Sequence, residues 1–416
     1  MKIVVKILSL LVLLFVAFAA HAQNPVRCAT TEKFKEALAK NPAIALQREA
    51  LEQFTQEQIL RANSTTDTSI YTIPVIVHVV YHSFDAAAQN ISDSQIQSQM
   101  DAINEDFARL NADTSTTPLA FQSVAVDTKI RFQLTNKDPN GNPSSGIERI
   151  STAKNKVGSD DSLYSIAPAW DRTCYYNVWV CNIDGGNTLG FSYLPGTVVA
   201  DHDGTVVDYK AFGRIGNLFP SFNKGRTFTH EAGHFLNLLH TWGDSPSCIP
   251  DDDVSDTPLE SDASTGCPTF PLTDVCTTSA PGVMFMNYMN YVDDNCMNLF
   301  TAGQRDRMRA ALYLAPRDKL RDRSLCNVLS IQETKPKALR IYPNPVEKIV
   351  FITIPADFKV QQIAIYNILG QVVMQSINST QNDTLLNLDI SSLSPGMYFL
   401  RIVSNQQELQ ERFIKN

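Results

Sequence analysis

The segment from His230 to His240, which reads HEAGHFLNLLH, carries the residues whose types and spacing most clearly suit chemistry. Two histidines four positions apart lie on one face of a helix, so His230 and His234 can offer imidazole nitrogens to one metal ion. Glu231 lies beside them, and His240 can supply a third nitrogen. Three protein ligands leave a fourth zinc position open for water. The spacing therefore predicts a hydrolytic Zn²⁺ site with the three histidines as ligands and Glu231 as the general base.

Two features near the motif bear on this prediction. An alternative third ligand is Glu260, but it lies in DTPLESDASTG, which reads as a loop rather than the later helix that such a ligand requires. Asn237 stands where the longer pattern HExxHxxGxxH has glycine. That position needs a left-handed backbone to end the helix and turn His240 inward, and asparagine accepts this backbone more readily than most residues. We therefore expect a positive φ at Asn237.

Length and composition limit the class of protein. A chain of 416 residues predicts two or three domains. The net charge of −8 comes without any basic run that could follow phosphates, which argues against nucleic acid as a partner. Residues 1–22 combine two lysines, an apolar run and an Ala-His-Ala ending, which predicts a cleaved signal peptide rather than a retained membrane anchor. After its removal, no integral membrane segment is expected.

Residues 23–63 are polar and helix-prone, without the apolar bulk to form their own core. A segment of this kind after a signal peptide predicts a prosegment, for which Arg61 is a plausible cleavage site. Its one cysteine, Cys28, suggests a latency switch, because a thiolate bound to zinc would fill the open position. A half-cystine or an incidental thiol are the alternatives.

A folded domain is predicted over residues 64–330. YTIPVIVHVVYH reads as a buried strand, within which His78 is expected to be a core residue rather than a ligand. Apolar residues recur at helical spacing from 96 to 110 after a possible N-cap at Ser92 or Asp93, and further strands are expected at 130–134 and 176–180. The run 190–195 reads as an edge strand, where an extended peptide can dock through main-chain hydrogen bonds.

Eight cysteines in an exported chain favour disulfides over metal thiolates. Cys174 and Cys181 lie roughly 23 Å apart if the run between them is a strand with about 3.3 Å per residue, so they are not expected to pair. Cys326 has no partner that the sequence identifies. Two bridges could stabilise the loop-rich region after the histidine motif, which holds Cys248, Cys267, Cys276 and Cys296.

The stretch from residue 73 to 326 resembles the pappalysin-type metzincins, peptidase family M43, including cytophagalysin-like and ulilysin-like bacterial members. The resemblance rests on the zinc segment, HTWGD at 240–244, DVSDTP at 253–258 and MFMNYMNYVDDNCMNLFTAGQRDRM. It implies an α+β metzincin-like catalytic domain with a mixed sheet over a zinc-binding helix. It also implies a secreted, zymogenic endopeptidase that hydrolyses peptide bonds in protein or peptide substrates.

The resemblance further implies roles for residues after the zinc motif. Met289 would form the methionine turn beneath the metal. Tyr291 would help to stabilise the oxyanion, with packing under the site as its alternative role. The implied disulfides are Cys248 with Cys276 and Cys267 with Cys296.

Family members also bind structural calcium after the zinc motif, and a short loop here gathers oxygen ligands that suit Ca²⁺. A solvated acidic loop is the alternative. Some relatives cut next to arginine, and Asp293 and Asp294 could place a carboxylate in a primed-side pocket. The possible calcium ligands are Asp251, Asp252, Asp253, Asp256 and Thr257.

Residues 331–337 are predicted to be a linker, and residues 338–416 alternate short apolar runs with turns, which predicts a small all-β sandwich. YPNP, IYNILGQ and LSPGMYFLRI resemble the type A sorting domain of the type IX secretion system. This implies that the secretion machinery is a partner and that the protein is secreted or held at the cell surface. A sugar- or protein-binding β-module is the alternative.

A different class of function is a catalytically idle adhesin or binding protein on the same scaffold. A binding scaffold has no need of a general base. The intact Glu231 and the three histidines therefore favour the enzyme.

Overall fold

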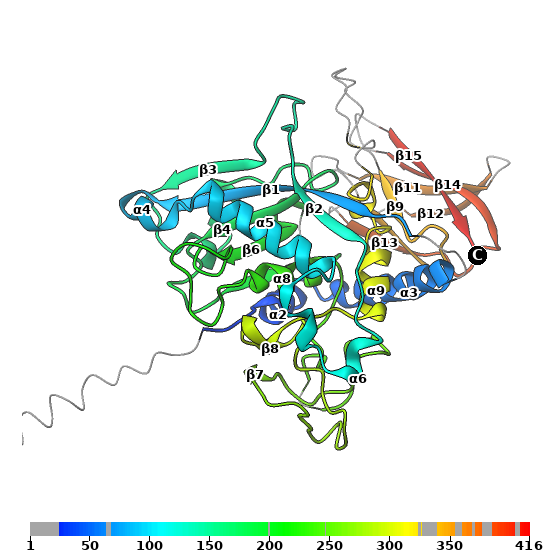
Figure 1. Ribbon diagram of the computed structural model, residues 1–416. Helices are drawn as coiled ribbons and strands as arrows, with labels where there is room; N and C mark the ends of the chain where they lie inside the picture. The colour runs from blue at the N-terminus through cyan, green and yellow to red at the C-terminus, as the bar shows by residue number, and fades with distance from the viewer. Residues whose placement is uncertain are drawn as a thin grey trace, which may run out of the picture.

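A computed structural model describes residues 25–63, 68–198, 200–245, 247–322, 326, 339–353, 360–367, 371–376, 385–403 and 408–416 (Figure 1). The predicted signal peptide at 1–22 and the predicted linker at 331–337 lie outside these residues. Within them, no helix combines the length and the apolar character that crossing a membrane requires.

The main domain is built on a mixed six-stranded sheet. Five strands run parallel, and the edge strand β5 runs antiparallel to its neighbour β6. The central strands β1 and β4 are largely buried, which explains why they read as near-continuous apolar runs. The strands are β1 (Tyr71–His82), β2 (Ile130–Leu134), β3 (Ile147–Thr152), β4 (Tyr176–Cys181), β5 (Gly190–Ser192) and β6 (Gly204–Asp208).

Two helices, α5 (Asp93–Phe107) and α8 (Arg226–Phe235), pack against each other; α5 also contacts β2, and α8 contacts β5 and β6. Ser92 caps α5, because its side chain accepts a hydrogen bond from the backbone N–H of Gln95. Leu110 was expected to continue the helical face but is exposed, since Arg109 takes a left-handed φ of 54° and the helix has ended. The short helices are α4 (Ala86–Gln89), α6 (Leu119–Gln122) and α7 (Ser162–Ile166).

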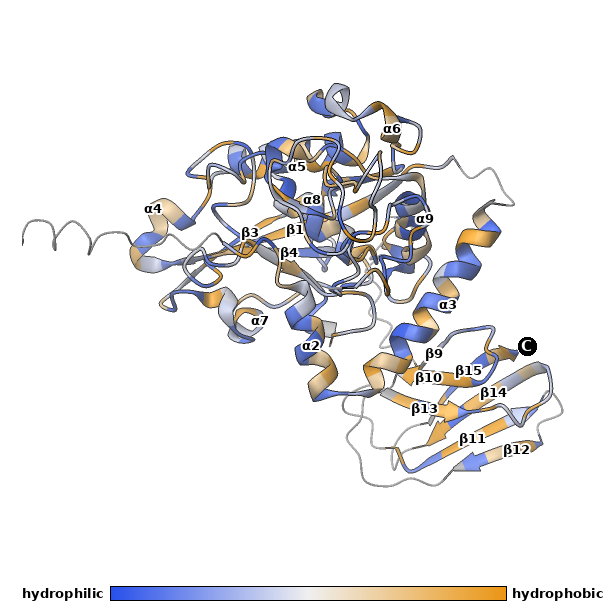
Figure 2. Ribbon diagram, turned by 90° about the horizontal axis from the view of Figure 1, so that it is seen from below, coloured by the Kyte–Doolittle hydropathy of each residue, from blue (hydrophilic) through white to orange (hydrophobic). Residues whose placement is uncertain are grey.

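The N-terminal segment, residues 25–63, forms two helices, α2 (Thr30–Lys40) and α3 (Ala43–Asn63). Asn41 and Pro42 separate them, in line with the poor fit of proline inside a helix. Helix α3 lies alongside α9 (Ala302–Ala311), as Figures 1 and 2 show. The helix-prone composition of this segment therefore corresponds to real helices that pack on the main domain.

Between α8 and α9 the described chain has little regular structure: the two-residue strands β7 (Thr265–Gly266) and β8 (Tyr291–Val292) and one short 3-10 helix (Asp294–Cys296). Two disulfides cross this region and join the pairs that the resemblance implied, Cys248 with Cys276 and Cys267 with Cys296. Such cross-links restrict the unfolded chain where few apolar contacts are available.

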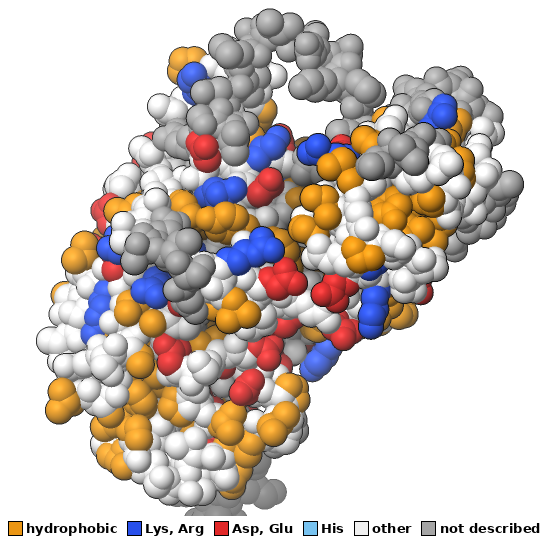
Figure 3. All heavy atoms as spheres, turned by 90° about the vertical axis from the view of Figure 1, so that its right-hand side faces the viewer, with side chains coloured by type: hydrophobic (Ala, Val, Ile, Leu, Met, Phe, Trp, Pro, Cys, Tyr) orange, Lys and Arg blue, Asp and Glu red, His pale blue; other side chains and the backbone are white. Residues whose placement is uncertain are grey.

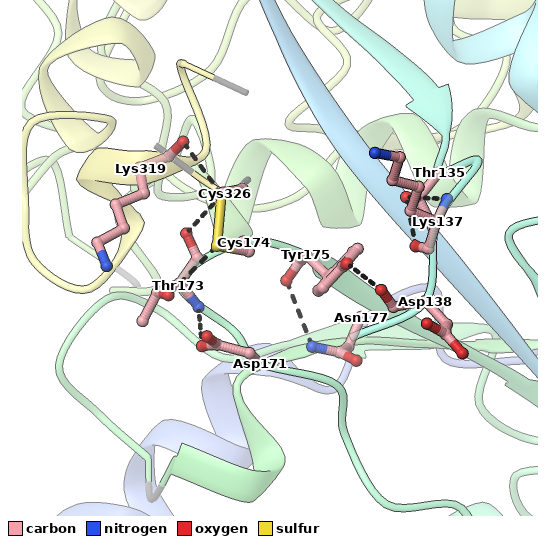
Figure 4. The surroundings of a disulfide bond; sticks show 10 residues. All are labelled: Thr135, Lys137, Asp138, Asp171, Thr173, Cys174, Tyr175, Asn177, Lys319 and Cys326. Carbon is pink, nitrogen blue, oxygen red and sulfur yellow. Dashed lines mark hydrogen bonds between the residues drawn. A yellow bond between two sulfur atoms is a disulfide. The ribbon is translucent and has the colours of Figure 1, made fainter. Parts of the chain in front are cut away.

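A third disulfide joins Cys174, just before β4, to Cys326, which follows α9 in the chain (Figure 4). Cys174 and Cys181 are not paired, as predicted. Among the described residues, the free cysteines are Cys28 and Cys181, and both are buried.

The C-terminal module has its own apolar core and two antiparallel sheets, whose strands carry many of the apolar residues in Figure 2. One sheet has the order β13-β10-β9 and the other β12-β11-β14-β15. Acidic and basic side chains are interspersed on the face that Figure 3 shows, in keeping with the modest net charge. The strands are β9 (Arg340–Tyr342), β10 (Ile349–Thr353), β11 (Gln362–Asn367), β12 (Val372–Ser376), β13 (Leu385–Asp389), β14 (Gly396–Val403) and β15 (Glu408–Lys415).

Candidate metal centre and active site

Helix α8 carries the first two histidines and ends immediately before the turn that leads to the third. All ten of its residues are buried. After the helix, Asn237 adopts a φ of 73°, the left-handed backbone expected from the sequence. Its N–H bonds the carbonyl of His234 at 2.9 Å, and the N–H of Leu238 bonds that of Gly233 at 2.9 Å. The turn satisfies helix carbonyls and brings His240 back toward the helix.

The three Nε2 atoms converge on one point. They are 3.1 Å apart for His230 and His234, 3.2 Å for His230 and His240, and 3.0 Å for His234 and His240. Tetrahedral zinc with bonds of about 2.0–2.1 Å places two ligand nitrogens about 3.4 Å apart. The three rings are buried, so these nitrogens have little water to solvate them. The donor set therefore fits one zinc ion.

The second nitrogen of each ring is held by a hydrogen-bond acceptor. The Nδ1 atom of His230 is 2.7 Å from the carbonyl of Tyr288, and that of His234 is 2.8 Å from the carbonyl of Leu238. The Nδ1 atom of His240 is 2.6 Å from the Asp244 carboxylate. These partners select the tautomer with a free lone pair on Nε2, as metal ligation requires.

Burial keeps the first two imidazoles neutral. It lowers the pKa of His230 well below its usual value, and neighbouring histidines act in the same direction. Burial and the proximity of His240 lower the pKa of His234 to about 3. At neutral pH both rings therefore offer lone pairs rather than protons to a cation.

Glu231 lies beside the histidine cluster and is fully buried. Its Oε2 accepts a hydrogen bond from the Thr30 hydroxyl at 3.2 Å, while Oε1 has no partner among the described groups. Burial raises the pKa of Glu231 to about 8, against the lowering effect of Cys28, Thr30 and Arg27. A carboxyl group whose pKa is near neutral can both accept and return a proton.

Met289 and Tyr291 make different contacts near the cluster. Met289 is fully buried against Gly233, where a Cβ atom would come within 2.4 Å of its sulfur. The glycine of HEAGH therefore gives Met289 the space to pack under the helix. The Tyr291 hydroxyl donates a hydrogen bond to the Cys28 carbonyl at 3.1 Å, and its ring centroid is 4.9 Å from that of His240.

Cys28 joins the histidines in one potential metal-ligand group. Its sulfur and the ligand nitrogens of the three histidines all lie within 4.8 Å of one another. In the part of the chain that the structure describes, this is the one group of three or more histidine, cysteine, aspartate or glutamate residues whose ligand atoms converge in this way. The thiol is buried and also accepts a hydrogen bond from the Thr30 N–H at 3.3 Å.

The residues around Cys28 lie along the start of the edge strand β5 and the residues that lead into it. Val26 N–H bonds the Asn187 carbonyl at 2.6 Å, Leu189 N–H bonds the Val26 carbonyl at 3.0 Å, and Ala29 N–H bonds the Gly190 carbonyl at 3.0 Å. The bridge between Val26 and Thr188 is parallel. The N-terminal segment thus occupies the start of the edge that was predicted to accept an extended peptide, and the Thr30 hydroxyl accepts the Ser192 N–H further along it at 2.9 Å.

Arg27 fills a buried pocket next to the cluster. Its guanidinium donates to the Val292 carbonyl and to the Asp294 carboxylate, both at 3.0 Å, and lies 5.2 Å from the centre of the Phe222 ring. Asp294 is fully buried and also accepts backbone N–H groups of α8 and of the residues before it. Asp293 is only partly buried. Of the two predicted aspartates, Asp294 is the one that faces the pocket.

The five residues proposed as calcium ligands do not converge. Asp252 accepts a hydrogen bond from the Thr257 hydroxyl at 2.8 Å, but Asp256 accepts bonds from Thr301 and the Gly303 N–H at the start of α9. A carboxylate oxygen of Asp253 lies 3.9 Å from a terminal guanidinium nitrogen of Arg307. Asp251 instead accepts the backbone N–H of Asp253. The acidic side chains are used locally, in turns and at a helix terminus.

Glu260 is not part of the histidine cluster. It is buried and accepts hydrogen bonds from Thr241, Ser264 and Asn290, so it connects the chain after His240 to the methionine turn. His78 is a core residue, as predicted: its Nδ1 is 2.7 Å from Glu148 and its Nε2 is 3.0 Å from Asn177.

Sequence reasoning missed the roles of Asp244, Thr30 and Arg27. Asp244 lies in the HTWGD motif, four positions after His240. A carboxylate this close in sequence to a metal-ligating histidine could have been recognised as a group that orients the ligand. Thr30 and Arg27 carried no comparable pattern, because their partners lie about two hundred residues or more away in the chain.

Solved structures of mirolysin and promirolysin are similar to this chain. Mature mirolysin of Tannerella forsythia in complex with a cleaved peptide shares 46% sequence identity, with a TM-score of 0.57, over 61% of this chain and 97% of that one. A mutant of promirolysin from the same organism shares 40% identity, with a TM-score of 0.63, over 71% of this chain and 96% of that one. The second similarity extends to a zymogen.

Curated relatives are extracellular metalloproteases. One from Pyricularia oryzae is 34% identical over 58% of this chain and 74% of the relative. One from Neurospora crassa is 29% identical over 70% of this chain and 89% of the relative. The model of the M43 peptidases, described as pregnancy-associated plasma protein-A, matches residues 159–313. The model of a secretion system C-terminal sorting domain matches residues 340–416. The chain belongs to the M43 metallopeptidase family and is a secreted or cell-surface metalloendopeptidase with a type IX sorting domain.

Proposed function

We propose that the chain is the zymogen of a zinc-dependent endopeptidase, with the three histidines as metal ligands and Glu231 as the general base. The observation that carries the proposal is the convergence of three buried Nε2 atoms within 3.0–3.2 Å of one another. The acceptors on the opposite ring nitrogens support it, because they prepare the rings for a metal. The intact base argues against an idle adhesin.

Zinc bound there would act as a Lewis acid that acidifies a water molecule and polarises the substrate carbonyl. Glu231 would accept the proton of the attacking water through its unpartnered Oε1 and deliver it to the leaving amine. Tyr291 would donate a hydrogen bond to the developing oxyanion. The hydrogen bond that the Tyr291 hydroxyl donates to the Cys28 carbonyl supports this role, because that acceptor is a peptide carbonyl beside the metal-ligand group.

Latency in this proposal comes from the N-terminal segment as a prosegment. Cys28 would supply the fourth metal ligand, in place of water, and residues 26–30 would cover the edge strand that substrates need. The ligand group that includes Cys28 and the main-chain bonds to residues 187–190, where β5 begins, support this assignment.

Substrate preference in this proposal is for arginine next to the scissile bond. The buried contact of Arg27 with Asp294 supports it, because the same pocket would pair with a substrate guanidinium. Asp294→Asn is expected to lower kcat/KM about 10- to 100-fold for an arginine peptide, with little change for the matched alanine peptide. Initial rates on the peptide pair provide the measurement.

Asp293→Asn is the matched control, since it removes the same charge one residue away from the pocket. An equal loss on both peptides for Asp294→Asn would contradict the specificity role and indicate damage to the fold.

We keep calcium in the proposal with two of the five predicted ligands, Asp252 and Thr257. Asp252 is buried, and burial raises its pKa to about 8, so a nearby cation would relieve an unfavourable buried carboxylate. If Asp252 and Thr257 bind Ca²⁺, its removal by EGTA is expected to lower the melting temperature by several degrees. Each kcal/mol of lost unfolding free energy lowers the melting temperature by about 4–8 °C in small domains and by less in larger ones. An unchanged melting temperature would remove calcium from the proposal.

Casein or gelatin hydrolysis by the processed enzyme tests the proposed function as a whole. We expect about one zinc ion per chain, loss of hydrolysis with 1,10-phenanthroline, and recovery when zinc is returned. The isomer 1,7-phenanthroline, which does not chelate, is the control. Hydrolysis that persists after zinc has been removed would contradict the proposal.

A further inference from the structure

Helix α3 presents one face to the main domain, away from the Cys28 contact. Arg48, Leu51, Glu52 and Thr55 follow one another at spacings of three, one and three residues, which places them on one side of a helix. All four contact the same surface. We call this surface the α3 dock; it consists of Pro195, Gly196, Asn237, Arg307, Ala311 and Leu314.

Arg307 is the centre of the α3 dock. This side chain on α9 is 1% exposed, and its Nε donates to the Asn237 carbonyl at 2.8 Å. Its two terminal nitrogens bond both carboxylate oxygens of Glu52, one of them at 2.6 Å. One buried guanidinium thus holds the metal-site turn on one side and α3 on the other, in the paired geometry that makes arginine–carboxylate contacts strong.

Asn237 makes two further contacts with α3 through its side chain. Its Oδ1 accepts a hydrogen bond from Arg48 at 2.7 Å, and its Nδ2 donates to the Thr55 hydroxyl at 3.2 Å. Arg48 also donates to the Pro195 carbonyl at 3.2 Å. A glycine at position 237 could form the same turn but neither of these bonds. The irregular residue of the zinc motif therefore has a partner on the N-terminal segment.

Apolar packing completes the contact. Leu51 is 8% exposed and packs with Ala311 and Leu314. It also lies over Gly196, where a Cβ atom would come within 2.6 Å of the leucine side chain. A helix side chain that packs into a recess, with polar bonds around it, is the usual form of a helix-in-groove interface.

We propose that α3 is the main affinity anchor of the prosegment and that it keeps the segment bound, as a non-covalent inhibitor, after the chain has been cut in the last turn of α3, which holds Arg61, or beyond it. This inference rests on the proposed function and adds a second step to activation. Cutting the chain removes the covalent link but none of the contacts in the α3 dock. The enzyme then becomes active only when the segment dissociates or is itself degraded.

The test uses processed full-length enzyme and synthetic peptides that span residues 25–63. The wild-type peptide is expected to inhibit hydrolysis in trans, and Glu52→Gln to raise its inhibition constant about 10- to 100-fold, because Arg307 loses its charged partner. Glu49→Gln is the matched control, since Glu49 is exposed on α3 and carries the same charge. It is expected to inhibit like wild type.

Fluorescence anisotropy with labelled peptides separates binding from inhibition. A Cys28→Ala peptide is expected to keep measurable binding through α3, and the Glu52→Gln peptide to bind more weakly than wild type. Equal binding of the Glu52→Gln and wild-type peptides would overturn the proposal, as would prompt loss of the cut segment on gel filtration. Because binding is measured without substrate, this result is independent of whether the proposed proteolytic function is correct.

Discussion

Replacing Glu231 with glutamine is expected to lower kcat/KM by about 10²- to 10⁴-fold while the enzyme keeps its zinc. Glutamine has nearly the same shape, so the helix and the three histidines have no steric reason to move. It cannot accept a proton, however, and the general base is thereby removed. Peptide hydrolysis and metal content of the purified variant give the two measurements.

Two further variants test the ligand set. Glu260→Gln changes another buried glutamate, whose partners are Thr241, Ser264 and Asn290 rather than the histidines, so zinc should be retained. His240→Ala should lose zinc. Loss of zinc in Glu260→Gln but not in His240→Ala would reverse the assignment of the third ligand. Full activity in Glu231→Gln would exclude Glu231 as the general base.

Replacing Cys28 with alanine in the full chain is expected to raise the activity of the uncut precursor at least about tenfold. A tenfold change corresponds to about 1.4 kcal/mol, less than a metal–thiolate contact should contribute. Release should remain incomplete, because Ala29 still bonds Gly190, and α3 still occupies its dock. Initial rates should be measured on precursor that intact mass spectrometry shows to be uncut.

Cys181→Ala is the appropriate comparison for this experiment. Cys181 is the other free, buried cysteine among the described residues, but it lies on β4 and is not in the ligand group. Its replacement should leave latency unchanged. A Cys28→Ala precursor that is as latent as wild type would contradict the switch and leave the backbone contacts and α3 as the inhibitory elements.

The metal site was largely predictable because its geometry is encoded locally. Histidines four apart must share a helix face, and the turn at position 237 must be left-handed if the third histidine is to return. The structure brings these three nitrogens together and gives Asn237 a positive φ. Residues separated by a few positions are constrained by the helix itself, so spacing alone carries the information.

Other parts of the site were not predictable, for two physical reasons. The Arg27–Asp294 and Glu52–Arg307 contacts join residues more than two hundred positions apart, and no periodicity records such pairs. The acidic loop shows the second reason: composition counts carboxylates but not their directions. Asp256 points to the start of α9, where backbone N–H groups attract a carboxylate, rather than toward Asp252.

The Cys174–Cys326 bridge determines where a mechanical load would enter the protein. It closes a ring with a sequence separation of 152 residues that contains the three histidines proposed as zinc ligands, and beyond Cys326 the chain leads to the sorting domain. A pull on that domain during export would thus be transmitted at Cys174 to β4, which is held between β1 and β6. Helix α9 and the metal site would lie outside the line of force until the bridge was reduced.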